Sequence, residues 1–277
     1  MFSSGTAVLL IFLVVIIGII LQMWKNSRRL KAKLNEIFPE AWRDVLKKRV
    51  AFYAPLNDAD KNLFEKRVQR FLATKIIEAV DTEIDDTVRL MVASSAIIPT
   101  FAFPDYNYPN VRTILIYPNS FNEKYQTETL EGNEKRNILG MVGNNIQNAT
   151  VILSKPDLVS AFDGLPHKEN VGIHEFVHML DKADGDIDGI PEALLQHQYV
   201  APWLREIKSE MSKIEKGTSD INPYALTNNA EFLAVVSEYF FDNPEKFERK
   251  HAELYKFLSN IYKGDKDAPS DADNKPK

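Results

Sequence analysis

The chain has 277 residues, of which 44% are hydrophobic and 26% are charged, as expected for a globular protein with a substantial core. Residues 1–33 carry five basic side chains and no acidic one, so the rest of the chain holds 29 basic and 39 acidic side chains, a net charge of −10. Such an acidic body repels phosphate backbones, which argues against nucleic acid as a partner. The absence of cysteine excludes disulfides, cysteine-ligated zinc, iron–sulfur clusters and thiol nucleophiles.

The first 24 residues contain no ionisable side chain, and the stretch 7–21 is apolar apart from Gly18. As a helix, residues 6–24 would rise about 28 Å, close to the hydrocarbon thickness of a bilayer. Basic residues follow this stretch instead of preceding it, unlike in a cleavable signal peptide. The sequence therefore predicts one transmembrane helix over residues 1–24. The basic cluster that follows predicts a single-pass protein of the inner (cytoplasmic) membrane whose body faces the cytoplasm.

The remaining sequence predicts mostly helices around a short β region. Residues 30–50, interrupted at Phe38-Pro39, and 57–72 are rich in helix formers, and 82–96 is a further candidate helix before the proline-rich loop 99–109. Strands are predicted at 111–117 and 150–153 by their density of β-branched residues. Helices are again predicted at 170–181, 192–215 and 229–241. Residues 263–277 are almost free of apolar side chains and predict a disordered tail.

Two of the five histidines lie four residues apart in the segment His174-Glu175-Phe176-Val177-His178. On a helix, residues four apart share one face, so both imidazoles can bind a single metal ion with Glu175 beside them. This spacing is typical of zinc hydrolases. The alternative is a pair of unrelated surface histidines, but the apolar residues around the motif predict a buried helix, in which imidazoles need partners.

A catalytic zinc ion needs a third protein ligand and an open position for water. Asp184 stands six residues after His178, where some zinc peptidases have their third ligand, but Asp181 replaces the glycine that lets the chain turn back. Glu231 and Glu238 lie on a later predicted helix, about 10 Å apart along its axis, so at most one of them can bind the same ion. The residues alone leave Asp184, Glu231 and Glu238 open as the third ligand.

Several segments together resemble the Mlc titration factor A family of zinc peptidases. They are residues 151–154, Phe162-Asp163-Gly164, His174 to Asp181, 184–191, Tyr224-Ala225 and Ala230 to Phe241, and weaker similarity extends over most of residues 35–260. The resemblance implies that His174, His178 and Glu231, seven residues after Tyr224, hold Zn²⁺, with Glu175 as catalytic base. The predicted anchor departs from the best-known members of that family, which are soluble cytoplasmic proteins.

Further residues have candidate supporting roles at this site. Tyr224 would donate to the developing oxyanion, or would simply pack before the helix. Asp181 would accept the distal N–H of His178, and Glu238 would orient a histidine, although a solvated carboxylate is the alternative for each. The strand that ends at Ser154 would offer its edge to an extended peptide, unless it is a plain core strand.

These observations predict an α+β, zincin-like metallopeptidase domain over residues 25–262, with a small mixed sheet, a helical part up to about residue 100 and a predominantly helical remainder. The predicted function is zinc-dependent hydrolysis of peptide bonds, in which Glu175 activates a zinc-bound water. The family resemblance implies aminopeptidase-type cleavage of a peptide substrate. It also implies an alternative function, in which a regulatory binding protein sequesters a transcriptional repressor of sugar uptake.

Overall fold

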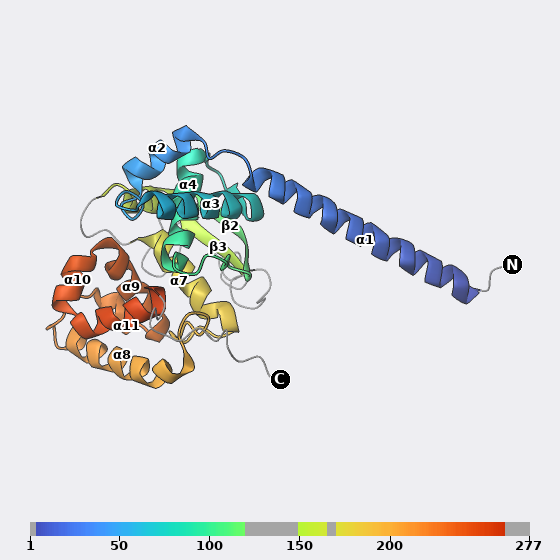
Figure 1. Cartoon of the computed structure of the whole chain (residues 1–277). Coiled ribbons are helices and arrows are strands. Elements are labelled where there is room, and N and C mark those ends of the chain that lie inside the picture. The colour runs from blue at the N-terminus through green and yellow to red at the C-terminus, as the bar shows by residue number, and fades with distance from the viewer. Residues whose placement is uncertain (1–3, 120–148, 165–169, 264–277) are drawn as a thin grey trace, which may run out of the picture.

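The computed structural model describes residues 4–119, 149–164 and 170–263 (Figure 1). The predicted tail at 263–277 therefore lies outside the described residues except for Lys263, which ends the last helix. The helices and strands are α1 (Ser4–Leu34), α2 (Glu40–Arg49), α3 (Asp58–Thr74), β1 (Ile76–Ala79), α4 (Asp86–Ile97), β2 (Val111–Tyr117), β3 (Ala149–Ser154), α6 (Lys155–Ala161), α7 (Val171–Asp181), α8 (Val200–Glu215), α9 (Asn229–Asp242), α10 (Pro244–Lys250) and α11 (Ala252–Lys263).

The described sheet has three strands in the order β1-β2-β3, and both pairings are parallel, with Ile77 opposite Ile114 and Ile114 opposite Val151. The predicted mixed sheet of an α+β domain is therefore wrong. The physical reason is the connection between β1 and β2, which contains α4. This connection returns the chain to the end of the sheet at which β1 begins, so β2 runs parallel to β1. The predominance of helices around a small sheet agrees with the prediction.

The helix α7 lies between the sheet and the C-terminal helices, which form the lower part of the molecule in Figure 1. It packs on α4 and β3 at one side and on α9 at the other. Its side chain Phe176 is fully buried and contacts Phe71 of α3 and Tyr108 edge to face. Gly172 allows the close approach of α4, because a Cβ there would lie 2.1 Å from Oγ of Ser95. The core thus holds α7 firmly on two sides.

The predicted helix at 192–215 begins later than expected, since α8 starts only at Val200 and turns precede it. Pro202 explains this boundary, because proline fits the first turn of a helix but breaks its interior. The strand β1 was not predicted. It is only four residues long, and a single buried side chain, Ile77, gives it no alternating pattern.

The helix α1 projects away from the rest of the molecule in Figure 1. Among the described residues, no helix has both the length and the apolar character needed to cross a membrane. This finding contradicts the predicted transmembrane anchor and the predicted single-pass location in the inner membrane.

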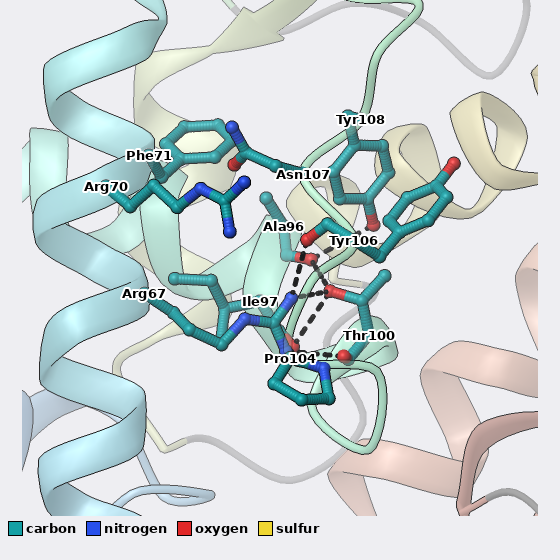
Figure 2. Close-up of a pocket in the computed structure, with 10 residues that line it drawn as sticks. All are labelled: Arg67, Arg70, Phe71, Ala96, Ile97, Thr100, Pro104, Tyr106, Asn107 and Tyr108. Atoms are coloured by element: carbon teal, nitrogen blue, oxygen red, sulfur yellow. Dashed lines mark hydrogen bonds between the residues drawn. The ribbon is translucent and has the colours of Figure 1, made fainter. Parts of the chain in front are cut away.

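A buried arginine fastens the loop between α4 and β2 to α3. The guanidinium of Arg67 donates to the backbone oxygen of Thr100, to its hydroxyl oxygen at 2.7 Å and to the backbone oxygen of Tyr106 at 3.1 Å. Figure 2 shows Arg67 reaching from its helix to Thr100 beneath the rings of Tyr106 and Tyr108. Burial lowers the pKa of Arg67 to about 10. The side chain therefore satisfies loop oxygens that would otherwise be buried without partners.

We expect Arg67→Met to lower the free energy of unfolding by about 2–4 kcal/mol, because three buried oxygens lose their donor. Chemical denaturation followed by circular dichroism measures the change. Arg70→Met is the matched control, since Arg70 lies one turn further on the same helix and lines the same small cavity. Equal stability of both variants would show that the arginine does not hold the loop.

Candidate metal centre

The two motif histidines lie on one face of α7. Asn170 caps this helix, since its side-chain oxygen accepts the N–H of Ile173 at 3.1 Å. His174 is 4% exposed and His178 is 9% exposed, so both imidazoles lie inside the protein. The apolar residues around the motif bury the helix and carry the histidines with it.

The helix α9 brings Glu231 to the same place. Asn228 caps α9 and accepts the backbone N–H of Glu231 at 2.9 Å, which fixes this residue in the first turn. The positive end of the helix dipole favours a carboxylate there.

Three potential ligand atoms converge where these two helices meet. Nε2 of His174 lies 3.1 Å from Nε2 of His178 and 3.0 Å from Oε2 of Glu231, and Nε2 of His178 lies 3.3 Å from the same oxygen. In the part of the chain that the structure describes, this is the group of histidine and acidic side chains that could hold a metal ion. The structure thus brings together all three residues that the sequence analysis proposed as ligands.

Glu238 contacts the opposite side of the same imidazole. Its Oε1 lies 2.7 Å from Nδ1 of His174, and its Oε2 accepts the backbone N–H of Asn170 at 2.6 Å. A carboxylate at Nδ1 places a proton on that atom, so a neutral His174 presents a lone pair at Nε2. This lone pair faces His178 and the Glu231 carboxylate. Such a set of acceptors is stable only with a cation, either a proton or a metal ion, between its members.

The protonation of the metal-free site follows from these contacts. Burial opposes a charge on His174, but hydrogen bonds to Glu231 and Glu238 and the nearby charge of Glu175 outweigh it and raise the pKa of His174 to about 10. Burial likewise opposes the Glu231 carboxylate, but hydrogen bonds from His174 and His178 lower its pKa to about 2. Without a metal ion, both nitrogens of His174 are therefore protonated at neutral pH, and the ring carries a positive charge.

The two proposed catalytic residues both lie beside the histidines. Glu175 is half-buried on α7, next in sequence to His174, and its charge acts on that imidazole. Tyr224 belongs to a short 3-10 helix, Pro223–Leu226, and its ring centroid lies 6.2 Å from that of His174. Both residues therefore lie close to His174, on different elements.

Asp181 and Asp184 do not belong to the group of three converging ligand atoms. Asp181 is fully buried, and its Oδ2 accepts the N–H of Gly189 at 2.9 Å, while among the described residues neither its Oδ1 nor Nδ1 of His178 has a hydrogen-bond partner. Asp184 accepts the N–H of Asp186 at 3.0 Å within the loop. Asp181 thus ties the end of α7 to Gly189, where a Cβ would lie 2.5 Å from the backbone oxygen of Asn229 at the start of α9.

The sequence analysis missed the roles of two asparagines. Asn170 and Asn228 cap the helices that carry the histidines and Glu231, and Asn170 also binds Glu238 through its backbone. A signal was present, because asparagine directly before an apolar periodic stretch is a preferred helix cap. The two caps therefore fix where the helices that carry the candidate ligands begin.

Comparison with known proteins agrees with this geometry. Residues 21–263 match the model of the glucose-regulated metallo-peptidase M90 family. The chain belongs to this family. The resemblance predicted from sequence is thereby confirmed for the family, although not for the anchor.

Individual relatives of this M90 peptidase family member cover nearly the whole chain. An uncharacterized protein, slr2042, of Synechocystis is 30% identical over 91% of this chain and 95% of its own length. Proteins named Mlc titration factor A are 24% identical in Pectobacterium atrosepticum, over 87% of this chain and 91% of theirs, and 28% identical in Cronobacter sakazakii, over 81% and 86%.

In the metal-free protein, we expect the His174 imidazole to remain protonated at pH 8 and to lose its proton near pH 10, as nuclear magnetic resonance of the imidazole nitrogens would record. Because the folded pKa lies above the ordinary value of 6.5, this charge contributes fully to stability below about pH 6.5, and the contribution is lost as pH rises through about 10. Glu238→Gln should lower the midpoint. A wild-type midpoint at or below 6.5 would contradict the proposed contacts.

Proposed function

We propose that this protein is a zinc-dependent peptidase with aminopeptidase-type activity, in which His174, His178 and Glu231 bind Zn²⁺. One observation carries the proposal: two imidazole nitrogens and one carboxylate oxygen converge within 3.0–3.3 Å at the meeting of α7 and α9. Membership of a metallopeptidase family supports the same reading.

The donor set and its spacing fit zinc better than magnesium or calcium. Two imidazoles and one carboxylate are the ligands of many catalytic zinc ions, whereas magnesium and calcium prefer oxygen ligands. Tetrahedral ligands about 2.0–2.1 Å from zinc lie about 3.3–3.4 Å apart. The observed separations of 3.0, 3.1 and 3.3 Å need only small outward movements to match this spacing.

A bound zinc ion would lower the pKa of a water molecule and polarise the peptide carbonyl. Glu175, half-buried beside His174, would take up the proton of the attacking water on its carboxylate and deliver it to the leaving amine. Tyr224, whose ring lies close to His174, would donate its hydroxyl proton to the oxyanion as charge develops. Glu238 would hold Nδ1 of His174 and so keep Nε2 directed at the ion.

A peptide substrate is supported by the position of β3. Among the described strands, β3 pairs only with β2, and it packs against α7. An extended peptide added to this edge would have its backbone hydrogen bonds satisfied by the strand, which packs against the helix that carries the histidines. The proposal of aminopeptidase-type cleavage rests on the resemblance to the Mlc titration factor A family.

A second candidate function is suggested by the names of the relatives. Several are called Mlc titration factor A, which indicates that they act on a partner called Mlc. By analogy, this chain would bind and sequester a transcriptional repressor, with the metal centre serving a structural or separate purpose. The catalytic glutamate distinguishes the two functions, because binding of a partner does not require a proton acceptor beside the metal ion.

Removal of a ligand should remove the metal. We expect Glu231→Ala to lose most of its zinc, whereas Glu238→Gln should retain the site with about 10–100-fold weaker affinity, because it disturbs only the support of His174. Elemental analysis and competition with a chelator measure the content and the affinity. Glu192→Gln, a change of one exposed glutamate, is the control. Equal zinc in the wild type and in Glu231→Ala would refute the assignment of the third ligand.

Substitution of the proposed base, Glu175, should abolish peptide hydrolysis without weakening the binding of zinc. We expect Glu175→Gln to reduce kcat for unblocked short peptides by at least about 100-fold, because general acid–base catalysis contributes that much or more. Zinc content should stay unchanged, since Glu175 is not a proposed ligand. If the variant cleaves peptides at the rate of Glu192→Gln, the assignment of Glu175 as the catalytic base is ruled out. If the biological role survives although hydrolysis is lost, the repressor-binding function is favoured.

A further inference from the structure

A cavity of about 620 Å³ adjoins the metal centre on the side of Glu238. Its wall includes Asn170 and Glu238, the two residues that support His174, together with Asn222 and Pro223, which directly precede Tyr224. The cavity is therefore continuous with the elements that build the proposed active site. It is large enough to hold a side chain or a small molecule.

The remaining wall is mainly apolar and aromatic. Phe52, Phe162 and Phe241 contribute rings from three separate segments, and Ile98 and Ile173 lie between them. Such a surface favours an aliphatic or aromatic stem, and the faces of aromatic rings also attract cations.

Most charges around the cavity are already neutralised by partners. Arg49 forms an ion pair with Asp163, Lys246 lies 3.1 Å from a carboxylate oxygen of Asp220, and Glu238 contacts His174. Among the described residues, these charged side chains are therefore already engaged by partners.

Asp242 is the exception. It follows Glu238 by four residues on α9, so it lies on the same face about 6 Å further along the helix. Its carboxylate lines the cavity and is accessible, yet its contact in the described structure is a long one, 3.4 Å from the side-chain nitrogen of Asn170. Among the described residues, no cation forms an ion pair with it. Loss of hydration around the carboxylate and, after it, the charge of the neighbouring Glu238 raise the pKa of Asp242 to about 7, so an incoming cation would stabilise its charged form.

We propose that this cavity binds the ammonium group of a peptide, with Asp242 as the counter-ion and the phenylalanine rings around the aliphatic stem. The ammonium group belongs either to a lysine side chain or to a free amino terminus. This inference rests on the proposed function and deepens it, because it makes the cavity a binding site for part of the peptide on the Nδ1 side of His174, away from the three converging ligand atoms.

Three probes with the same four-carbon side-chain skeleton test the pocket by calorimetry. Nα-acetyl-lysine amide carries only the side-chain ammonium, norleucine amide carries only the α-ammonium, and Nα-acetyl-norleucine amide carries neither. The zinc-loaded full chain with Glu175→Gln is used, so that the probes are not consumed. We expect at least one ammonium probe to bind about tenfold more tightly than the neutral probe, as a charged hydrogen-bonded pair requires. The probe that gains affinity identifies the source of the ammonium group.

Asp242→Asn in the same background should reduce this preference to less than about twofold, because the amide keeps the shape and removes the charge. The substitution should not unfold α9, since a negative charge at a helix C-terminus is unfavourable. Asp242→Ser serves as a second variant, and thermal unfolding checks both. Glu248→Gln, which removes an exposed carboxylate from α10, should leave the preference intact.

Equal binding of all three probes to the parent protein, or a preference that survives the loss of Asp242, would overturn the proposal. The result is independent of hydrolysis. If the wild type cleaves peptides but shows no ammonium preference, the pocket assignment fails alone. If the preference is present but no peptide is cleaved, the pocket is retained and the peptidase function fails.

Discussion

The position of one imidazole ring determines the arrangement of the candidate metal centre. His174 is held between Glu238 at Nδ1 and Glu231 at Nε2, so its ring cannot turn without breaking a contact on one side. The carboxylate at Nδ1 also decides which nitrogen carries the proton and which offers a lone pair. His178, one helical turn away, adds the second nitrogen. A metal ion would therefore find the ligands oriented before it binds.

This arrangement depends on how α7 and α9 are packed. The core fixes α7 through Phe176 and through the close approach of α4 at Gly172, while the N-terminal end of α9 is set by Asn228 and by the contact of Gly189 with Asn229. The hydrophobic core holds the two helices so that His174 and His178 of α7 lie within hydrogen-bond distance of Glu231 of α9. The polar caps define where each helix begins. Stability and ligand geometry are thus determined by the same contacts.

The sequence predicted the local features of this site better than the long-range ones. The pairing of His174 with His178 follows from helical periodicity alone, whereas the choice of Glu231 over Asp184 needed the family resemblance, because 53 residues separate it from His178. Strand direction was mispredicted, since it depends on the path of the connections and not on the residues within a strand. Apolar composition alone likewise led to an anchor that the described helices do not support.

The spacing of the two glutamates on α9 shows why sequence reasoning reached only part of the answer. Seven residues place Glu231 and Glu238 on one face of the helix but about 10 Å apart, which prevents both from binding one ion. The two nitrogens of an imidazole point in different directions, and a ring inserted between the carboxylates contacts both. Asp242 continues the same face by one more turn and opens into the cavity. A single helix face thus presents a carboxylate to the metal centre, a second to the imidazole behind it and a third to the adjoining pocket.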